Sequence, residues 1–373
     1  MKKKRIAIIG ANEAIAILIE KAKSLGYETH VFARQCGDPG ELSADFFYPI
    51  DISKREEILN KCKRIGVCGV CSITSDFAAP VASYVARELG LTCNPPETEI
   101  LARNKYEMRK ALKKAGLFAH NFLKADETID IDALKDLTYP LIVKPTDAWS
   151  SKGITRVNNV AEVVKAIKYA CSFSSERKAI IEEFIDGPEY SAECICFHGI
   201  YHVLAFTKKE TTGFPHYIET GHIQPSDISK NKQDEIKKFI SKALSALRIE
   251  NGAAHAEFRI TDKGEIAIME IGARMGGDNI GTFLTPYSTG MDYVKMVIDI
   301  ACGIAPDFSI VSKPRLIKTK FIMNKNDLDD YFAFVSDNPS SLIKKSKFDN
   351  DFSREITNSS DRHGYYIYEV IEK

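Results

Sequence analysis

The chain has 373 residues, of which 44% are hydrophobic and 27% are charged, a composition typical of a globular protein with more than one packed unit. Acidic and basic residues number 51 each, so no bulk charge attracts nucleic acid or an anionic membrane. No run approaches the roughly 18 apolar residues of a membrane span, and the apolar run after the basic start is too short for a signal peptide. We therefore expect a cytoplasmic protein that binds neither nucleic acid nor membranes.

Strands and helices alternate through the N-terminal region, which indicates a parallel, doubly wound α/β sheet. The expected strands are 4–9, 28–33 and 69–75, and the expected helices are 12–25, 53–65 and 77–89. The first strand is followed by Gly10-Ala11-Asn12, so the second glycine of a G-x-G-x-x-G dinucleotide fingerprint is missing. We expect a Rossmann-like domain over residues 1–96 that binds no dinucleotide and ends at Asn94-Pro95-Pro96.

Cysteines offer a second interpretation of this region. Cys68 and Cys71 form a C-x-x-C motif, but no further cysteine or histidine pair completes a zinc site. The motif lies in an apolar run, where a reduced cysteine behaves as a small hydrophobic residue. We favour a buried strand, and a redox protein that depends on these two residues is an alternative.

The pattern changes after the proline pair. A helix is expected over 104–115, and short β-branched strands then indicate an α+β domain built on antiparallel sheet. We assign residues 97–305 to this domain, with a lid at about 117–186, and residues 306–373 to a small C-terminal α+β region with strands near 315–323 and 365–372. That last region either lies beside the active site or forms a dimer contact.

Two glutamates stand in a predicted hairpin between residues 255 and 278. If Lys263 and Gly264 form a two-residue turn, Glu257 lies directly opposite Glu270; a three-residue turn with a bulge makes them diagonal neighbours. Two carboxylates on one apolar-flanked face suit Mg²⁺, which completes its shell with phosphate oxygens and water. Arg274 follows in a glycine-rich loop and can hold a phosphate or carboxylate oxygen.

Nucleotide-binding features are looser. No G-x-x-x-x-G-K-[ST] loop is present, but Lys144 lies within an apolar strand and needs an anionic partner. The small polar loop that follows it can place N–H groups and hydroxyls over phosphates. An apolar strand then leaves through acids into a Gly-Pro turn at 182–189, which can present backbone groups to adenine and an acid to ribose.

Together these motifs, in this order, resemble the ATP-grasp superfamily over roughly residues 1–305. They are Lys105 in NKYEMRKALKKAGL, Lys144 in LIVKP, the SSKG loop, EEFIDGPEYSAE, and Glu257 with Glu270-x-x-x-Arg274. Residues 219–226 and 269–278 look most like the L-amino acid ligase branch, and the biotin carboxylase and purine-synthesis branches are similar.

The resemblance implies a site for ATP and Mg²⁺, with Mn²⁺ as a possible substitute. Phosphates would contact Lys105, Lys144, Ser150, Ser151 and Gly153, and the base and ribose would contact Glu182, Glu183, Phe184, Ile185 and Glu189. Glu257 and Glu270 would carry Mg²⁺, and Arg274 would act with Lys144 on the reacting groups. Many members have Asn where this chain has Gly272, which puts a second metal in doubt.

The expected activity is an ADP-forming ligation of a small carboxylate, such as an amino acid, to an amine through an acyl phosphate. Asp76 can bind a substrate amino group, although capping of the next helix is the more ordinary role, and His222 can line the acceptor site. A bicarbonate-activating or purine-pathway ligase and a non-catalytic ATP-binding regulator are the alternatives. A homodimer is a possible assembly, and the sequence identifies neither substrate.

Overall fold

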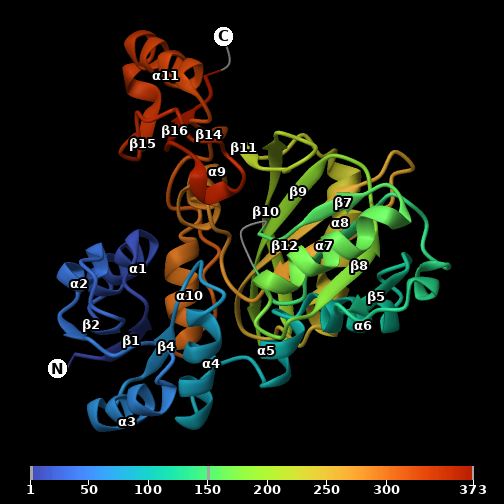
Figure 1. Cartoon of the computed structure of the whole chain (residues 1–373). Helices are drawn as coiled ribbons and strands as arrows, with labels where there is room; N and C mark the ends of the chain where they lie inside the picture. The colour runs from blue at the N-terminus through green and yellow to red at the C-terminus, as the bar shows by residue number, and fades with distance from the viewer. Residues whose placement is uncertain (1–2, 149–151, 372–373) are drawn as a thin grey trace.

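The computed structural model describes residues 3–148 and 152–371 and contains three sheets (Figure 1). The first is parallel, in the order β3-β2-β1-β4, as the alternation predicts. Its strands are β1 (Arg5–Ile9), β2 (Glu28–Phe32), β3 (Phe46–Tyr48) and β4 (Gly69–Cys71), connected through α1 (Glu13–Ser24), α2 (Pro39–Ser43) and α3 (Arg55–Ile65) and followed by α4 (Ala78–Glu88).

A helix from much later in the chain completes the packing of this first unit. Helix α10 (Tyr293–Ala301) lies against β4 and α1 and shares one apolar cluster with them, and Figure 1 shows it standing beside the N-terminal unit. At its end, Cys302 Sγ lies 3.8 Å from Cys68 Sγ, while Cys71 is buried in the strand. Cys68 therefore faces a distant cysteine in addition to its motif partner.

The second sheet is small and antiparallel, in the order β5-β8-β6-β7. Its strands are β5 (Phe122–Ala125), β6 (Leu141–Pro145), β7 (Thr155–Val157) and β8 (Ala179–Glu183), and α7 (Val160–Phe173) packs on it through a separate apolar cluster. A 3₁₀ turn, Ile131–Leu134, lies between β5 and β6. Two helices, α5 (Glu97–Leu101) and α6 (Lys105–Lys114), precede this sheet in the chain.

The third sheet has eight strands in the order β13-β12-β9-β10-β11-β14-β16-β15. They are β9 (Glu189–Phe197), β10 (Ile200–Thr211), β11 (Glu219–Gln224), β12 (Gly252–Ile260), β13 (Ile266–Gly272), β14 (Ile317–Phe321), β15 (Leu342–Lys345) and β16 (Tyr365–Glu369). The other helices are α8 (Lys230–Ala246), α9 (Thr285–Thr289) and α11 (Lys325–Asp337), with a π-helical turn at Ile280–Leu284. The C-terminal strands thus extend the same sheet through β11, which pairs with β14.

Alternation along the central strands decides which side chains reach the site. On β12, Ala254, Ala256 and Phe258 join a core that includes residues of α6 and α8, so His255 and Glu257 point to the opposite face. Helices α6 and α8 cover one face of this sheet, and the other face is turned toward the small sheet. Among the described residues, no helix has both the length and the apolar character needed to cross a membrane.

The hairpin of β12 and β13 pairs Glu257 directly with Glu270, although its turn is the three-residue alternative, for which diagonal neighbours were expected. Thr261 N donates to Glu265 O and Gly264 N donates to Thr261 O, so the turn has three residues and Gly264 takes a positive φ of 77°. A register shift between Glu257 and Phe258 then restores the direct pairing. The extra residue is Met269, and its carbonyl oxygen accepts a hydrogen bond of 2.7 Å from Arg109 Nη2.

Candidate active site

A cleft of about 490 Å³ lies between the large sheet and the small sheet, and residues of both sheets line it. It brings together ten of the predicted site residues from six strands, one helix and three loops. These are Asp76, Lys105, Lys144, Glu182, Phe184, Glu189, His222, Glu257, Glu270 and Arg274. Gly153, Glu183 and Ile185 are outside its lining, and Ser150 and Ser151 lie outside the described residues.

The small-sheet side of the cleft holds a buried cluster of two cations and one acid. Glu182 accepts from Arg109 Nε at 2.8 Å and pairs with Lys144 Nζ at 2.5 Å. Burial raises the pKa of Glu182, but the charges of Arg109 and Lys144 outweigh it and bring the pKa down to about 2. Burial together with the neighbouring cations lowers the pKa of Lys144 despite Glu182. This cluster therefore has room for one more negative charge.

Lys105 is the first residue of α6, where the Asn104 side chain accepts from the N–H groups of Tyr106 and Glu107 and fixes the helix start. Its ammonium group donates to Ala148 O at 2.8 Å and to Glu270 Oε1 at 3.0 Å. The lysine is only 5% exposed, so it bridges the β6 loop and the β13 carboxylate from inside the cleft.

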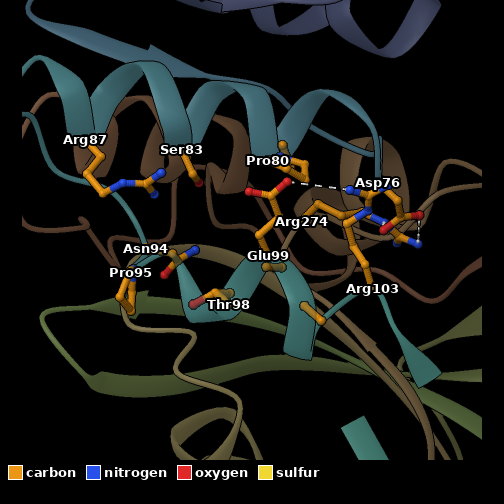
Figure 2. A pocket seen from close by; sticks show the side chains of 13 residues that line it. Asp76, Pro80, Ser83, Arg87, Asn94, Pro95, Thr98, Glu99, Arg103 and Arg274 are labelled. Carbon is orange, nitrogen blue, oxygen red and sulfur yellow. Dashed lines mark hydrogen bonds and ion pairs between the residues drawn. The ribbon is translucent and has the colours of Figure 1, made fainter. Parts of the chain in front are cut away.

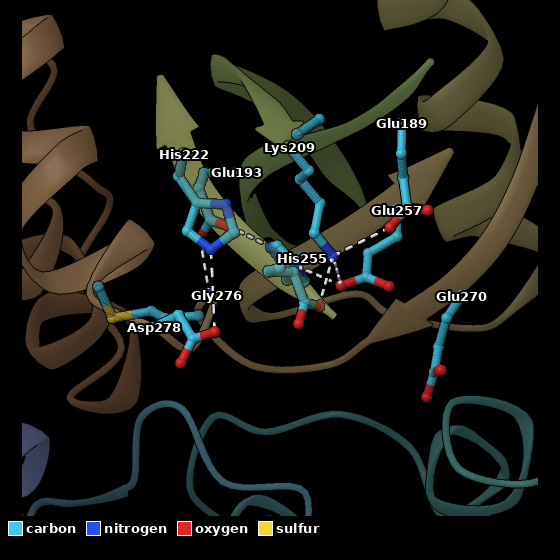
Figure 3. A network of polar contacts seen from close by, with 12 residues as sticks. Glu189, Glu193, Lys209, His222, His255, Glu257, Glu270, Gly276 and Asp278 are labelled. Carbon is cyan, nitrogen blue, oxygen red and sulfur yellow. Dashed lines mark hydrogen bonds and ion pairs between the residues drawn. The ribbon is translucent and has the colours of Figure 1, made fainter. Parts of the chain in front are cut away.

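Lys209 on β10 occupies the opposite electrostatic environment. Its ammonium group lies 2.8 Å from Glu257 Oε1, 3.2 Å from Glu189 Oε1 and 3.4 Å from Glu219 Oε1 (Figure 3). Burial alone would lower the pKa of Lys209, but the three carboxylates raise it well above its usual value. Lys209 is therefore a fixed positive charge under the acidic face of the sheet.

Glu257 and Glu270 are neighbours across β12 and β13 and extend to the same side of the sheet (Figure 3). Burial raises the pKa of Glu257, but Lys209 and His255 together lower it well below the usual value. Among the described residues, no group of three or more His, Cys, Asp or Glu side chains could hold a metal by itself. The two carboxylates nevertheless fit Mg²⁺, because that ion accepts one or two carboxylates and takes its other ligands from phosphate and water.

A second buried carboxylate lies behind Glu257. Glu193 on β9 is fully buried and contacts His255 Nδ1, while His255 Nε2 lies 3.1 Å from Glu257 Oε1. Burial lowers the pKa of His255, but the two glutamates raise it to about 9, so the ring is a cation at neutral pH. Glu193 also accepts a hydrogen bond of 2.9 Å from Gly276 N.

Arg274 follows β13 and is held from the N-terminal unit. Its Nε and Nη2 atoms each donate to Asp76 at 3.0 Å, and Nη1 donates to Met275 O at 3.1 Å. Burial works against the charge, but Asp76 raises the pKa of Arg274. Asp76 does not cap α4; Ser75 Oγ accepts from Ala78 N instead, because the Asp76 carboxylate is engaged by Arg274.

The Asp76–Arg274 pair also closes a smaller pocket between α4 and α5, which Figure 2 shows with Glu99 and Arg103 beside it. A Cβ atom at Gly272 would lie 3.2 Å from Arg274 Nε and 3.3 Å from Asp76 Oδ1. A side chain at position 272 would therefore have to displace this ion pair.

The C-terminal region contributes to the far end of the cleft. Arg362 donates to both oxygens of Asp278, at 2.9 and 2.8 Å, and its guanidinium group lies 3.7 Å from the centroid of Phe321. His222 is 1% exposed, and its Nε2 lies 3.8 Å from Asp278 Oδ2. Burial raises the pKa of Asp278, but His222 and Arg362 outweigh it and lower the pKa below its usual range.

The predicted adenine hinge has most of its polar groups engaged within the chain. The Glu183 carboxylate accepts hydrogen bonds from the backbone N–H groups of Asn121 and Thr138 and does not line the cleft. Phe184 N donates to Pro140 O, and Ile185 O accepts from Arg259. The Phe184 ring lines the cleft and has the Arg156 guanidinium group 4.4 Å from its centroid.

Among the residues missed from the sequence, Lys209, His255 and Arg362 line the cleft, and Arg109 lies behind it against Glu182. Arg109 had a signal, because it stands beside Met108 on the buried stripe of α6, one turn after Lys105. His255 had another, because it alternates with Glu257 on one face of a strand. Arg362 had no such signal in the sequence, because nothing in its polar loop indicates that it pairs with Asp278.

The family comparison agrees with this arrangement. Residues 137–282 match the family described as the ATP-grasp domain. The alanine–anticapsin ligase of Bacillus subtilis is 29% identical over 296 residues, which cover 69% of this chain and 61% of that relative. The chain thus spans about three-fifths of the length of this curated relative.

Solved structures share the fold over nearly the whole chain. The L-amino acid ligase of Bacillus licheniformis has a TM-score of 0.81 at 23% identity, with 99% of this chain and 94% of that chain covered. The biotin carboxylase domain of the Hydrogenobacter thermophilus 2-oxoglutarate carboxylase, solved with MgADP, ADP and bicarbonate, has a TM-score of 0.75 at 16% identity, covering 99% and 87%. Residues 137–282 therefore match an ATP-grasp domain, and the chain shares its fold with these solved structures.

Proposed function

We propose that the chain is an ATP-dependent, ADP-forming carboxylate–amine ligase that acts on an amino acid or a similar small carboxylate. The observation that carries this proposal is the cleft itself, where the acidic pair Glu257 and Glu270 lies with the buried cations Lys105 and Lys144 and the partly buried Arg274. Phosphoryl transfer depends mainly on positioning and charge stabilisation, and this site supplies both signs of charge at fixed places.

The triphosphate would lie between Lys144 on the small sheet and Lys105 on α6. Lys144 shares one carboxylate with Arg109, so a phosphate oxygen would balance the second positive charge. Glu182 then acts by holding Lys144 in place, and its own carboxylate is occupied. Ser150, Ser151 and Gly153 belong to the loop that would cover the phosphates.

The base would lie against Phe184, with Glu183 and Ile185 contributing only backbone atoms. The ribose would lie near Glu189, which is held by Arg259 Nη2 at 3.0 Å and by Lys209. Glu257 and Glu270 would hold Mg²⁺, or Mn²⁺ in its place, and the metal would neutralise charge on the phosphates. The chain's own cations complete that neutralisation.

In the proposed reaction, an oxygen of the substrate carboxylate attacks the γ-phosphorus and ADP leaves, giving an acyl phosphate. Arg274 stabilises the negative oxygens of this group, because its guanidinium group lies at the edge of the cleft beside Glu270. An amine then attacks the carbonyl carbon and forms the carbon–nitrogen bond, the carbon–oxygen bond to the phosphate breaks, and inorganic phosphate and one proton of the amine are released. Asp76 and His222 line the same cleft, and we expect the substrates to lie near them.

Substrate-dependent phosphate release is the direct test. Mg-ATP is incubated with single amino acids and amino-acid pairs, and phosphate is measured for the parent chain and for Glu270→Ala. We expect release only with the right pair and a loss of at least about 10³-fold in Glu270→Ala, because metal-held charge stabilisation contributes several kcal/mol. Glu265→Ala, at the exposed turn of the same hairpin, is the matched control and should retain activity.

The panel also separates the other candidates. Release with bicarbonate alone would support a carboxylase-type activation, and release with a purine-pathway ribonucleotide would support that branch. ATP binding without release from any of these substrates would contradict the ligase and favour a nucleotide-binding regulator.

A further inference from the structure

The carboxylate of Glu193 is outside the cleft and yet contacts two parts of the site. It is fully buried on β9, and the cleft lining does not include it. One oxygen, Oε1, contacts His255 Nδ1, and the other, Oε2, accepts from Gly276 N at 2.9 Å. Burying a carboxylate so completely is costly unless it is paired, so the groups that hold it define what it does.

The first contact leads to Glu257. His255 lies between Glu193 and Glu257, with one ring nitrogen toward each carboxylate (Figure 3). Glu257 Oε1 lies within hydrogen-bond distance of two groups, His255 Nε2 at 3.1 Å and Lys209 Nζ at 2.8 Å. Among the described residues, no hydrogen bond reaches Glu257 Oε2, so these contacts fix the rotamer and leave one oxygen facing the cleft.

The second contact leads to Arg274. Gly276 belongs to the loop that carries Arg274 and Asp278, and its N–H group is held by Glu193. A Cβ atom at position 276 would lie 2.4 Å from Glu193 Oε1 and 2.8 Å from His255 Nδ1. Any larger residue at this position would therefore have to push the Glu193 carboxylate and the His255 ring aside. At the next residue, Gly277, an added Cβ meets nothing within 4 Å.

We propose that Glu193 and His255 are positioning residues that hold the metal carboxylate Glu257 and the Arg274 loop in one fixed arrangement. This inference rests on the proposed function, because it gives Glu257 the role of a metal ligand. Partners behind a metal ligand orient it, and changing such a partner commonly costs about 10–100-fold in metal affinity. Glu193 does this through His255 for Glu257 and through the backbone for Arg274.

The test measures metal binding instead of turnover. Mn²⁺ is titrated into the full chain in the presence of ADP and followed by electron paramagnetic resonance, with ADP affinity in the absence of metal measured separately. For Glu193→Gln and for His255→Asn we expect Mn²⁺ to bind about 10–100-fold more weakly, with metal-free ADP affinity unchanged. Glu257→Gln serves as the reference for direct loss of a ligand.

Two glycine variants probe the same arrangement by steric contact. Gly276→Ala should weaken Mn²⁺ binding as Glu193→Gln does, because its new methyl group displaces both Glu193 and His255. Gly277→Ala adds the same methyl group one residue along and should change Mn²⁺ affinity by less than about twofold. Asp299→Asn, a buried acid on α10 paired with Lys295, controls for loss of a buried charge outside the cleft.

The outcomes separate the two proposals. Mn²⁺ binding by Glu193→Gln and Gly276→Ala within about twofold of the parent, with Glu257→Gln defective, would overturn the positioning role and leave the ligase proposal intact. A parent chain that binds ADP but no Mn²⁺ would overturn the metal site, and the positioning role with it. If Glu193→Gln fails to fold, His255→Asn and Gly276→Ala carry the same comparison.

Discussion

Two buried lysines on opposite sides of the cleft have contrasting environments. Lys144 on the small sheet shares the single carboxylate of Glu182 with Arg109, so two cations face one acid. Lys209 on the large sheet faces the carboxylates of Glu189, Glu219 and Glu257. The pKa of Lys144 is lowered by burial and by its neighbouring cations, whereas the pKa of Lys209 is raised by the surrounding acids.

The difference separates a ligand-binding cation from a structural one. A cation in excess gains from an added anion, so Lys144 is suited to a phosphate oxygen. A cation that is already surrounded by carboxylates has no such gain, and its removal would leave like charges close together. We therefore expect Lys209 to matter mainly for folding and for the position of Glu257, and Lys144 to matter mainly for ATP.

The largest expected effect is on folding when Lys209 is replaced. Lys209→Met leaves three partly buried carboxylates without their shared cation, and we expect the free energy of unfolding to fall by about 3–5 kcal/mol. Denaturant unfolding measures this directly. The control is Lys208→Met. Lys208 is adjacent to Lys209 in the chain and also pairs with an acid, Asp227, but its side chain is 37% exposed. An exposed pair contributes about 1 kcal/mol or less; equal losses in both variants would contradict the contrast.

The acid dependence of stability should come next. The pKa of Glu182 is lowered from 4.5 to about 2, so the stability it contributes is present above pH 4.5 and is lost as the pH falls toward 2. The shift corresponds to about 3 kcal/mol. Glu182→Gln should lack this portion of the acid-induced loss. Unfolding curves between about pH 5 and about pH 2.5 test it, and a slope equal to that of the parent would count against the cluster.

The effect of replacing Lys144 should appear in ATP binding. Lys144→Met removes one charge-assisted contact to phosphate, for which about 1.5–3 kcal/mol is typical, so ATP should bind about 10–150-fold more weakly. The free energy of unfolding should change by about 1 kcal/mol or less, because Arg109 still pairs with Glu182. Isothermal titration with ATP measures the affinity.

The matched control for Lys144 is Lys178→Met. Lys178 belongs to the same small unit and pairs with Asp126, but its side chain is 38% exposed and does not line the cleft. It should bind ATP like the parent. A loss of ATP affinity confined to Lys178→Met, or a large loss of stability in Lys144→Met, would break the distinction between the two lysines.

Local patterns in the sequence were sufficient to predict much of this site. The pairing of Glu257 with Glu270 follows from alternation along two strands, and it holds although the turn has three residues, because a bulge at Met269 restores the register. Lys144 was recognisable because a charge within an apolar strand requires a partner. The parallel N-terminal sheet and the antiparallel sheets beyond it also follow from periodicity.

The partners of those residues were not predictable in the same way. Asp76 binds Arg274 across 198 residues, Lys209 lies under Glu257 from 48 residues away, and Arg362 reaches Asp278 from the C-terminal region. Nothing in the local sequence records such separations, because strand order and the return of α10 to the first unit bring these residues together.

The sequence alone therefore determined most of the strands, though not, for instance, β3 or β15, the face that each side chain takes along a strand, and the residue types that an ATP-binding cleft would need, since these depend on local periodicity and side-chain chemistry. The tertiary structure decided which charge each of those residues meets. Glu182 was expected beside the nucleotide and is enclosed by Arg109 and Lys144, while Glu257 is oriented by Lys209 and by the buried pair of Glu193 and His255. Electrostatic pairing depends on distance in space, and only the packed fold sets that distance.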